Sequence, residues 1–207
     1  MSQLAMKENT QPSCTFSDFT DFSALQDDMI TTYKLINLYQ DIFSEPDGWA
    51  ENYSYEEIYN NLSHELSKPA HLRLCIDSRE ENEVVGFCWA QLLSLKDICQ
   101  TINTVQHYNN LGTPDIFKPL NDVLNNEPMI YCHDLGIKRD LRGKLSLNKI
   151  IYPTLASVSK QTGVNKVLFW TIANTHVSAL AKRAGFDLIL LHSGMQFYSG
   201  TIDFARV

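Results

Sequence analysis

The second half of the chain alternates strand-like and helix-like segments, and this order restricts the fold more than any other feature. The run KVLFWTIA at 166–173 is continuously apolar, which is typical of a strand buried on both faces. A helical pattern precedes it from Ser146 to about Gln161, and a second one follows at 175–186. The apolar segments at 129–137 and 186–202 supply further strands. Such alternation predicts a sheet with helices packed on its faces.

The first half predicts two helices and a hairpin. Apolar side chains recur at helical spacing from about Asp27 to Ser44. Ser54 and Glu57 form a capping-box pattern that starts a second helix. The runs 71–78 and 83–94 are rich in β-branched and aromatic residues around a polar turn, which indicates a hairpin. Together the segments predict an α/β (α+β) fold, a mixed, mostly antiparallel central sheet of about six to seven strands flanked by helices.

These segments predict one domain at 25–207 that follows an N-terminal arm or edge element at 1–24. An insertion at about 95–128 is polar and proline-containing, and we expect it to hold short helices. Pro153 lies inside the expected helix from Ser146. Because proline lacks the backbone N–H, a kink or a late start is predicted at this residue. Gly163 is expected just after the end of the helix.

Composition excludes several classes of function. The 207 residues carry a net charge of −7, so no basic face is expected for nucleic acid. An acidic surface suits a cationic amine partner, although solubility alone also explains it. Five cysteines without Cys-x-x-Cys spacing favour reduced thiols over a disulfide framework or a metal site. We find no signal-peptide pattern and no apolar stretch long enough to span a membrane, and we expect a soluble, cytoplasmic protein.

Three segments carry motifs whose order is informative. HDLGIKRDLRGKLSL at 133–147 runs from an apolar strand through a basic turn into a helix. Asn174-x-x-Val-x-x-x-Ala-x-x-x-Gly-Phe begins the region of the last helix, and IFSEPDGWAENYSYEEI spans 42–58. Over about residues 25–202 the chain thereby resembles the GNAT (Gcn5-related N-acetyltransferase) superfamily. The resemblance implies acetyl-CoA as co-substrate and an acceptor-side loop within 42–58.

The basic turn is where the resemblance predicts the coenzyme to bind. A strand-to-helix turn directs free backbone N–H groups outward, and these favour a pyrophosphate. Arg142 and Lys144 add positive charge, and Gly143 permits close approach of the backbone. The resemblance also implies a pantetheine arm along the preceding strand. The residues expected to bind the coenzyme are therefore Leu135, Gly136, Ile137, Arg142, Gly143, Lys144, Leu145, Ser146 and Asn174.

Other interpretations of these residues stay open. The turn could be an ordinary solvated basic turn, and Asn174 could serve as a helix N-cap. Three residues depart from the family pattern. Asp140 brings a negative charge, Leu145 brings a branched side chain toward the phosphates, and Ala181 stands where the family often has a tyrosine that protonates the thiolate. These departures favour a second hypothesis, a catalytically impaired GNAT-fold domain that binds CoA or another ligand in a regulatory role.

His133 and Asp134 are the candidate catalytic residues. They stand where polyamine acetyltransferases of the family carry Glu-Asp. An imidazole with an ordinary pKa near 6.5 can accept a proton from an ammonium, so His133 is the candidate base, and Asp134 would order the site or bind substrate. A buried strand histidine with a satisfied nitrogen is the alternative. Trp49, Tyr53 and Tyr55 could wall the acceptor pocket and hold a cation over their rings, or they could pack the loop on the core.

The function predicted from the sequence is N-acetyl transfer from acetyl-CoA to a primary amine of a small molecule or peptide, by direct transfer. A longer acyl donor is a further alternative, because the turn is unusual. The expected partner is the amine substrate, without nucleic acid or membrane. A homodimer would be in keeping with the last strands, which in such sheets often pair between subunits.

Overall fold

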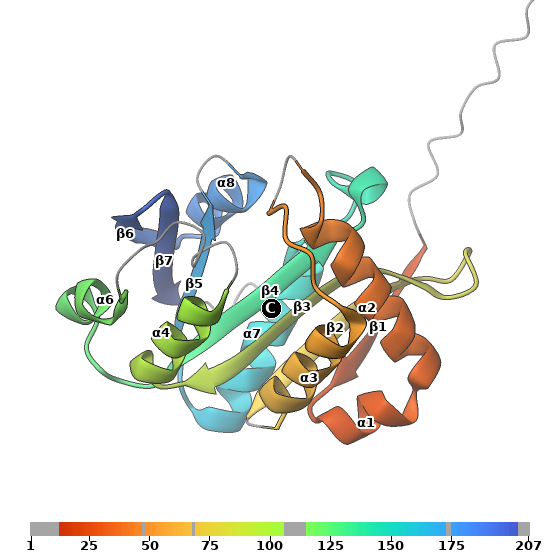
Figure 1. Cartoon of the computed structure of the whole chain (residues 1–207), viewed down its shortest axis with the longest axis horizontal. Helices are drawn as coiled ribbons and strands as arrows, with labels where there is room; N and C mark the ends of the chain where they lie inside the picture. The colour runs from red at the N-terminus through yellow and green to blue at the C-terminus, as the bar shows by residue number, and fades with distance from the viewer. Residues whose placement is uncertain (1–12, 47–48, 68, 106–114, 173–174, 203–207) are drawn as a thin grey trace, which may run out of the picture.

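The protein is built around one twisted sheet with helices on both of its faces (Figure 1). The computed structural model describes residues 13–46, 49–67, 69–105, 115–172 and 175–202. The expected coenzyme ligand Asn174 lies outside these ranges. No helix in the described part of the chain combines the length and the apolar character needed to cross a bilayer.

The sheet has seven strands in the order β1-β2-β3-β4-β5-β7-β6. All neighbouring strands are antiparallel except β4 and β5, which are parallel. The predicted mixed, mostly antiparallel sheet is therefore confirmed. The strands are β1 (Cys14–Phe19), β2 (Ala70–Asp77), β3 (Glu83–Leu93), β4 (Met129–Ile137), β5 (Lys166–Ile172), β6 (Asp187–His192) and β7 (Met195–Thr201).

Helices cover the sheet in two layers (Figure 1). One face packs against α2 (Met29–Phe43), α3 (Tyr55–Glu65), α4 (Leu95–Thr104) and α6 (Phe117–Val123). The opposite face packs against α7 (Asn148–Thr162) and α8 (His176–Arg183). The two helices α4 and α6 lie in the insertion at 95–128, as expected. The face covered by α2 and α3 is called the α2/α3 face below.

Caps read from the sequence fix several helix ends. Ser54 and Glu57 bond each other's backbone and side chain in the capping box that starts α3, which confirms that prediction. Gly163 follows α7 with a φ of 74°, the left-handed conformation that ends helices. A short helix that the sequence pattern did not predict, α1 (Phe22–Asp27), precedes α2. Asp28 caps the start of α2, so the helix expected from about Asp27 to Ser44 is observed from Met29 to Phe43, and α1 is a separate helix before it.

Pro153 does not delay the start of α7, which begins at Asn148 and continues through the proline. The expected late start is therefore wrong. A proline at this position leaves the carbonyl of Lys149 without its helical N–H donor. The Arg73 guanidinium from β2 donates its Nε hydrogen to that carbonyl over 3.0 Å. A side chain of the sheet thus replaces the missing helical hydrogen bond.

The described part of the expected N-terminal arm is joined to the sheet. β1 pairs with β2 along its whole length, from Cys14 opposite Asp77 to Phe19 opposite Leu72. It is the edge strand of the sheet, which agrees with the edge element that the sequence left open.

Candidate active site

A β-bulge in β4 brings the two candidate catalytic residues to one face of the sheet. Ala90 of β3 pairs with Cys132, and the residue before it, Trp89, pairs with Asp134, so His133 has no partner in β3. His133 is therefore the extra residue of a bulge. In a regular strand, His133 and Asp134 would point to opposite faces. Here the His133 ring packs on Tyr131 and Asp134 bonds Tyr39 of α2, so both lie on the α2/α3 face.

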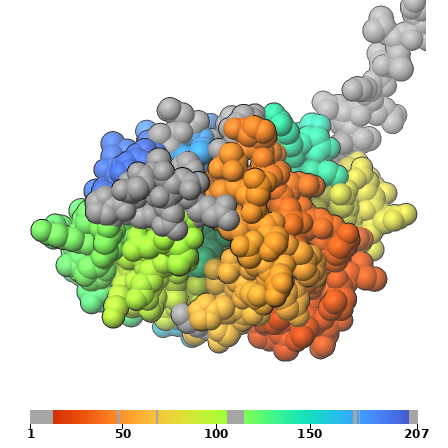
Figure 2. Space-filling model, in the orientation of Figure 1, coloured from red at the N-terminus to blue at the C-terminus, as the bar shows by residue number. Residues whose placement is uncertain are grey.

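Just beyond the bulge, β4 separates from β5. The two strands pair only at Ile130 with Val167 and at Tyr131 with Leu168. Residues 132–135 are half-buried, whereas both ends of β4 are buried. In Figure 2 the surface is hollowed between α3 and α4, with atoms of β4 at the floor. The strand edge that follows the bulge is therefore the part of β4 that a ligand could reach.

His133 has partners for both ring nitrogens. Its side chain is 4% exposed, and Nδ1 lies 3.4 Å from Glu65 Oε1 at the end of α3. Nε2 is in contact with the side-chain amide nitrogen of Gln91 on β3. The Tyr131 ring packs edge-on against the imidazole, with 4.5 Å between ring centroids. This environment favours the alternative of a buried, hydrogen-bonded strand histidine over a free general base.

Asp134 has the proton affinity that a general base needs. Withdrawal from solvent raises the pKa of its carboxyl from 3.8 to about 7, and the Glu51 carboxylate adds to the rise. The Tyr39 hydroxyl donates a hydrogen bond to Asp134 Oδ2 over 3.3 Å and opposes the shift. Burial and the negative charge of Asp134 raise the pKa of the Tyr39 phenol. Tyr39 thus stays protonated while Asp134 gains and loses its proton near neutrality.

Two of the three expected acceptor-side aromatic residues lie toward this site. The Tyr53 hydroxyl donates to Glu51 Oε2 over 3.0 Å, and its ring centroid lies 5.7 Å from that of Tyr39. The Trp49 ring meets Trp170 of β5 edge-on at 5.1 Å. Both residues therefore line the end of the sheet at which β4 and β5 diverge.

Tyr55 is not brought together with them. Its ring stacks on Tyr59, with 6.2 Å between centroids, and lies 6.3 Å from Tyr33. Tyr33 is 57% exposed on α2. These contacts place Tyr55 in a separate surface cluster of tyrosines between α2 and α3.

The basic turn after β4 retains only some of its expected backbone donors. The N–H groups of Leu141, Arg142, Lys144 and Leu145 bond carbonyls of the same turn. Within the described residues, no hydrogen bond is formed by the amides of Gly143, Ser146, Leu147 and Asn148. The φ of Gly143 is +79°, and, its two chain neighbours aside, no heavy atom of the described residues lies within 4 Å of the position a Cβ would take. The donors available to an anion are therefore at Gly143 and at the start of α7.

Arg142 is engaged with the end of α2. Its guanidinium forms two hydrogen bonds to the Glu45 carboxylate, at 2.7 and 2.8 Å, and a third to the Ile137 carbonyl at 3.1 Å. Lys144 is exposed and has no ion-pair partner among the described residues. Lys144 therefore offers an accessible positive charge, and Arg142 would have to exchange or share Glu45 to meet a phosphate.

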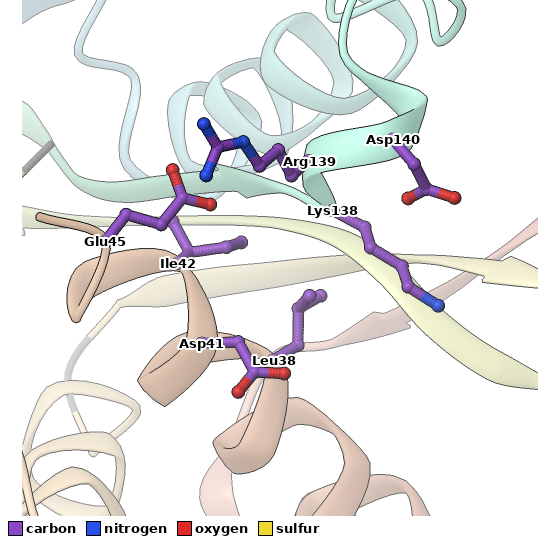
Figure 3. A pocket seen from close by; sticks show the side chains of 7 residues that line it. All are labelled: Leu38, Asp41, Ile42, Glu45, Lys138, Arg139 and Asp140. Atoms are coloured by element: carbon purple, nitrogen blue, oxygen red, sulfur yellow. The ribbon is translucent and has the colours of Figure 1, made fainter. Parts of the chain in front are cut away.

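A pocket of about 310 Å³ opens between this turn and α2. Figure 3 shows side chains of α2 and its C-terminal end on one wall and side chains of the turn on the other. Its lining combines three acidic, two basic and two apolar residues. The lining residues are Leu38, Asp41, Ile42, Glu45, Lys138, Arg139 and Asp140.

The three departures from the family pattern now have positions. Leu145 does not project toward the phosphates, because its side chain packs on the apolar cluster that holds Ile137 and Ile150. Ala181 is 3% exposed and packs in the core between α7, α8 and the sheet. Asp140 lines the pocket beside α2. The Leu145 side chain therefore does not fill the turn, and the side chain at Ala181 supplies no proton donor.

Several site residues were missed by sequence reasoning. Glu65 and Gln91 contact His133, and Tyr39 and Glu51 set the surroundings of Asp134. One signal was present, because Gln91 is a polar residue inside an otherwise apolar strand. The other three residues come from helices and loops far away in the sequence, and only the tertiary structure brings them to β4.

Comparison of the sequence with protein-family models and with curated proteins gives no match. Comparison of the structure with solved structures gives clear matches. An acetyltransferase of the GNAT family from Staphylococcus aureus Mu50 is 13% identical, with a TM-score of 0.59 over 92% of this chain and 100% of that one. A polyamine N-acetyltransferase of Drosophila melanogaster, which forms N-acetylagmatine, is 14% identical, with a TM-score of 0.59 over 91% and 99%.

Arabidopsis thaliana NAA60 in complex with acetyl-CoA is 17% identical, with a TM-score of 0.51 over 92% of this chain and 99% of that one. The structural matches are thus GNAT acetyltransferases that align along almost their entire length. The fold of this chain is the GNAT fold.

Proposed function

We propose that this protein is an N-acetyltransferase that moves the acetyl group of acetyl-CoA directly to a primary amine of a small molecule or peptide. The observation that carries the proposal is the divergence of β4 from β5 after two paired positions, beside a bulge that turns Asp134 to the α2/α3 face. Solved neighbours with this fold include one with acetyl-CoA bound and one that acetylates agmatine. Both ligand classes support the assignment.

The unpaired edge of β4 is the proposed binding site of the coenzyme's thiol arm. Backbone groups from Leu135 to Ile137 would hydrogen-bond the amides of the arm, in the manner of an added strand. The diphosphate would meet the free N–H groups of Gly143 and Ser146 at the start of α7. A helix N-terminus favours such an anion, and the Lys144 ammonium adds charge. Asn174 remains a predicted ligand outside the described residues.

Asp134, more than His133, is proposed as the general base. The acceptor ammonium first gives one proton to the Asp134 carboxylate, because only the neutral amine nitrogen can attack the thioester carbonyl carbon. As the new C–N bond forms and the C–S bond breaks, the coenzyme leaves as a thiolate, and the second proton lost by the nitrogen passes through solvent to that thiolate. A base works best with a pKa near the working pH, and the pKa of Asp134 is about 7. His133 would support this group by holding the bulge beside it.

The test combines coenzyme binding with thiol release. Isothermal titration with CoA and acetyl-CoA measures binding, and a thiol-trapping assay follows acetyl transfer to a panel of spermidine, agmatine and peptides with a free α-amine. We expect micromolar binding and acceptor-dependent thiol release. Asp134→Asn should lower kcat by roughly a hundredfold or more, in line with the loss of a general base, and should leave CoA binding intact.

The matched control is Asp122→Asn, which removes an exposed carboxylate on α6. It should behave as the wild type does. Absence of CoA binding at high micromolar concentration would refute the proposal. CoA binding without thiol release from any amine in the panel would instead favour the regulatory CoA-binding domain.

A further inference from the structure

A line of four side chains connects α3 to the bulge of β4. The Trp89 indole N–H donates to Glu65 Oε2 over 2.7 Å. The other oxygen of the same carboxylate, Oε1, lies 3.4 Å from His133 Nδ1. On the far side of the ring, Nε2 meets the amide nitrogen of Gln91. Glu65 is the last residue of α3, so its carboxylate links this helix end to β3 and β4.

The donor and acceptor types along this line determine the state of the imidazole. A carboxylate can only accept hydrogen bonds, so the ring nitrogen facing Glu65 must carry the hydrogen. In a neutral imidazole the opposite nitrogen, Nε2, then has a lone pair. The –NH₂ group of Gln91 donates to that lone pair. The contacts with Glu65 and Gln91 therefore fit neutral His133 with its hydrogen on Nδ1.

The orientation of Gln91 supports this assignment. Gln91 is 2% exposed, and among the described residues its buried Oε1 has no hydrogen-bond partner. An unpartnered buried carbonyl costs about 1 to 3 kcal/mol. The reverse orientation would place the carbonyl oxygen at Nε2, which would then need a hydrogen of its own. The buried carbonyl without a partner is thus the consequence of directing the –NH₂ group to His133.

We propose that Glu65 is a positioning residue that acts through His133. By holding Nδ1–H, it fixes the tautomer and orientation of the ring, and the fixed ring holds the bulge that turns the adjacent Asp134 toward the α2/α3 face. The effect on catalysis rests on the proposed function. The effect on the imidazole does not, and it can be measured in the protein without any substrate.

The first measurement is the tautomer of His133 by two-bond ¹H–¹⁵N NMR of the ¹⁵N-labelled protein, with the resonance assigned through His133→Gln. The wild type should show hydrogen on Nδ1 alone. Glu65→Ala removes the acceptor for that hydrogen, so the population should move to the Nε2–H form, with the Gln91 carbonyl as the new acceptor. Hydrogen on Nε2 in the wild type, or an unchanged tautomer in Glu65→Ala, would overturn the proposal.

The control is Glu56→Ala, which removes an exposed carboxylate from the same helix. It should leave the His133 resonances unchanged. Urea denaturation of both variants identifies any general loss of folding. The proposal is supported if Glu65→Ala keeps its cooperative unfolding transition while the His133 ring changes its tautomer.

The second measurement is steady-state kinetics with the best amine of the panel. Misplacement of a catalytic group by about 1 Å can cost a hundredfold in rate. Glu65→Ala should lower kcat roughly tenfold to a hundredfold and change the KM for acetyl-CoA by no more than about twofold, because the coenzyme contacts lie elsewhere. Equal kcat in Glu65→Ala and wild type would refute the positioning role. If the wild type acetylates no amine, the proposed function fails, and the NMR comparison still decides whether Glu65 sets the tautomer.

Discussion

Replacing Asp134 by asparagine should stabilise the protein at alkaline pH while it removes the proposed base. In the unfolded chain the Asp134 carboxyl loses its proton near 3.8, and in the folded protein near 7. Between these values the folded state holds a proton that the unfolded state lacks. The free energy of unfolding therefore falls as the pH rises through this window. A rise in pKa from 3.8 to about 7 corresponds to about 4 kcal/mol.

Asparagine keeps an oxygen that can accept from Tyr39 and has no charge to bury. At pH 4 the wild type and Asp134→Asn should have similar free energies of unfolding. At pH 8 the variant should be more stable by about 2 to 4 kcal/mol, the lower figure allowing for the partial access of residues 132–135 to solvent. Urea denaturation at half-unit steps from pH 4 to pH 8 measures the difference, in which the titration of most other groups cancels.

One result of this pH series would refute the raised pKa of Asp134. A difference in stability that is constant between pH 4 and pH 8 would mean that Asp134 titrates normally in the folded protein. Asp134 would then lack the raised pKa on which its proposed role as a base depends. Asp122→Asn, with its exposed carboxylate, should show a flat difference from the wild type across the same range. The same substitution at Asp134 is thus expected to raise stability and lower activity, as is common when a buried charge serves catalysis.

Two further predictions concern the scaffold. Gly136→Ala should cost about 1 to 3 kcal/mol of unfolding free energy in urea, because the new Cβ would lie 2.5 Å from the buried Phe87 ring; wild-type stability would show that the ring can move aside. Arg73→Gln should lower the free energy of unfolding by about 1 kcal/mol less in a Pro153→Ala background than in the wild type. The reason is that alanine at position 153 restores a helical N–H donor to the Lys149 carbonyl, which Arg73 bonds in the wild type. Additive effects in this double-mutant cycle would show that Arg73 does not replace that donor.

Local sequence patterns were sufficient for most of the fold. The capping box at Ser54, the glycine after α7 and the continuous apolar run of β5 each act within a few residues, so their outcome does not depend on distant packing. The course of α7 through Pro153 was not predictable in this way. It depends on Arg73, which approaches from another strand.

The site was predictable only in outline. The resemblance indicated His133 and Asp134 as a pair, yet a period-two strand pattern gives no sign of the bulge that turns both to one face. Leu145 was expected to crowd the phosphates, and its side chain instead joins the apolar cluster beneath the turn. Glu65 could not be related to His133 from the sequence, because that contact joins the end of a helix to a strand 68 residues later.

The single extra residue at the bulge also sets the phase of the remainder of β4. After His133, odd-numbered side chains face α7 and even-numbered ones face α2, so Leu135 and Ile137 enter one core and Gly136 meets Phe87 and Ile42 in the other. Deleting one residue here would exchange the two sets, pressing branched side chains into the space that admits only a glycine. Insertions and deletions should therefore be tolerated in the surface loops of this protein long before they are tolerated at position 133.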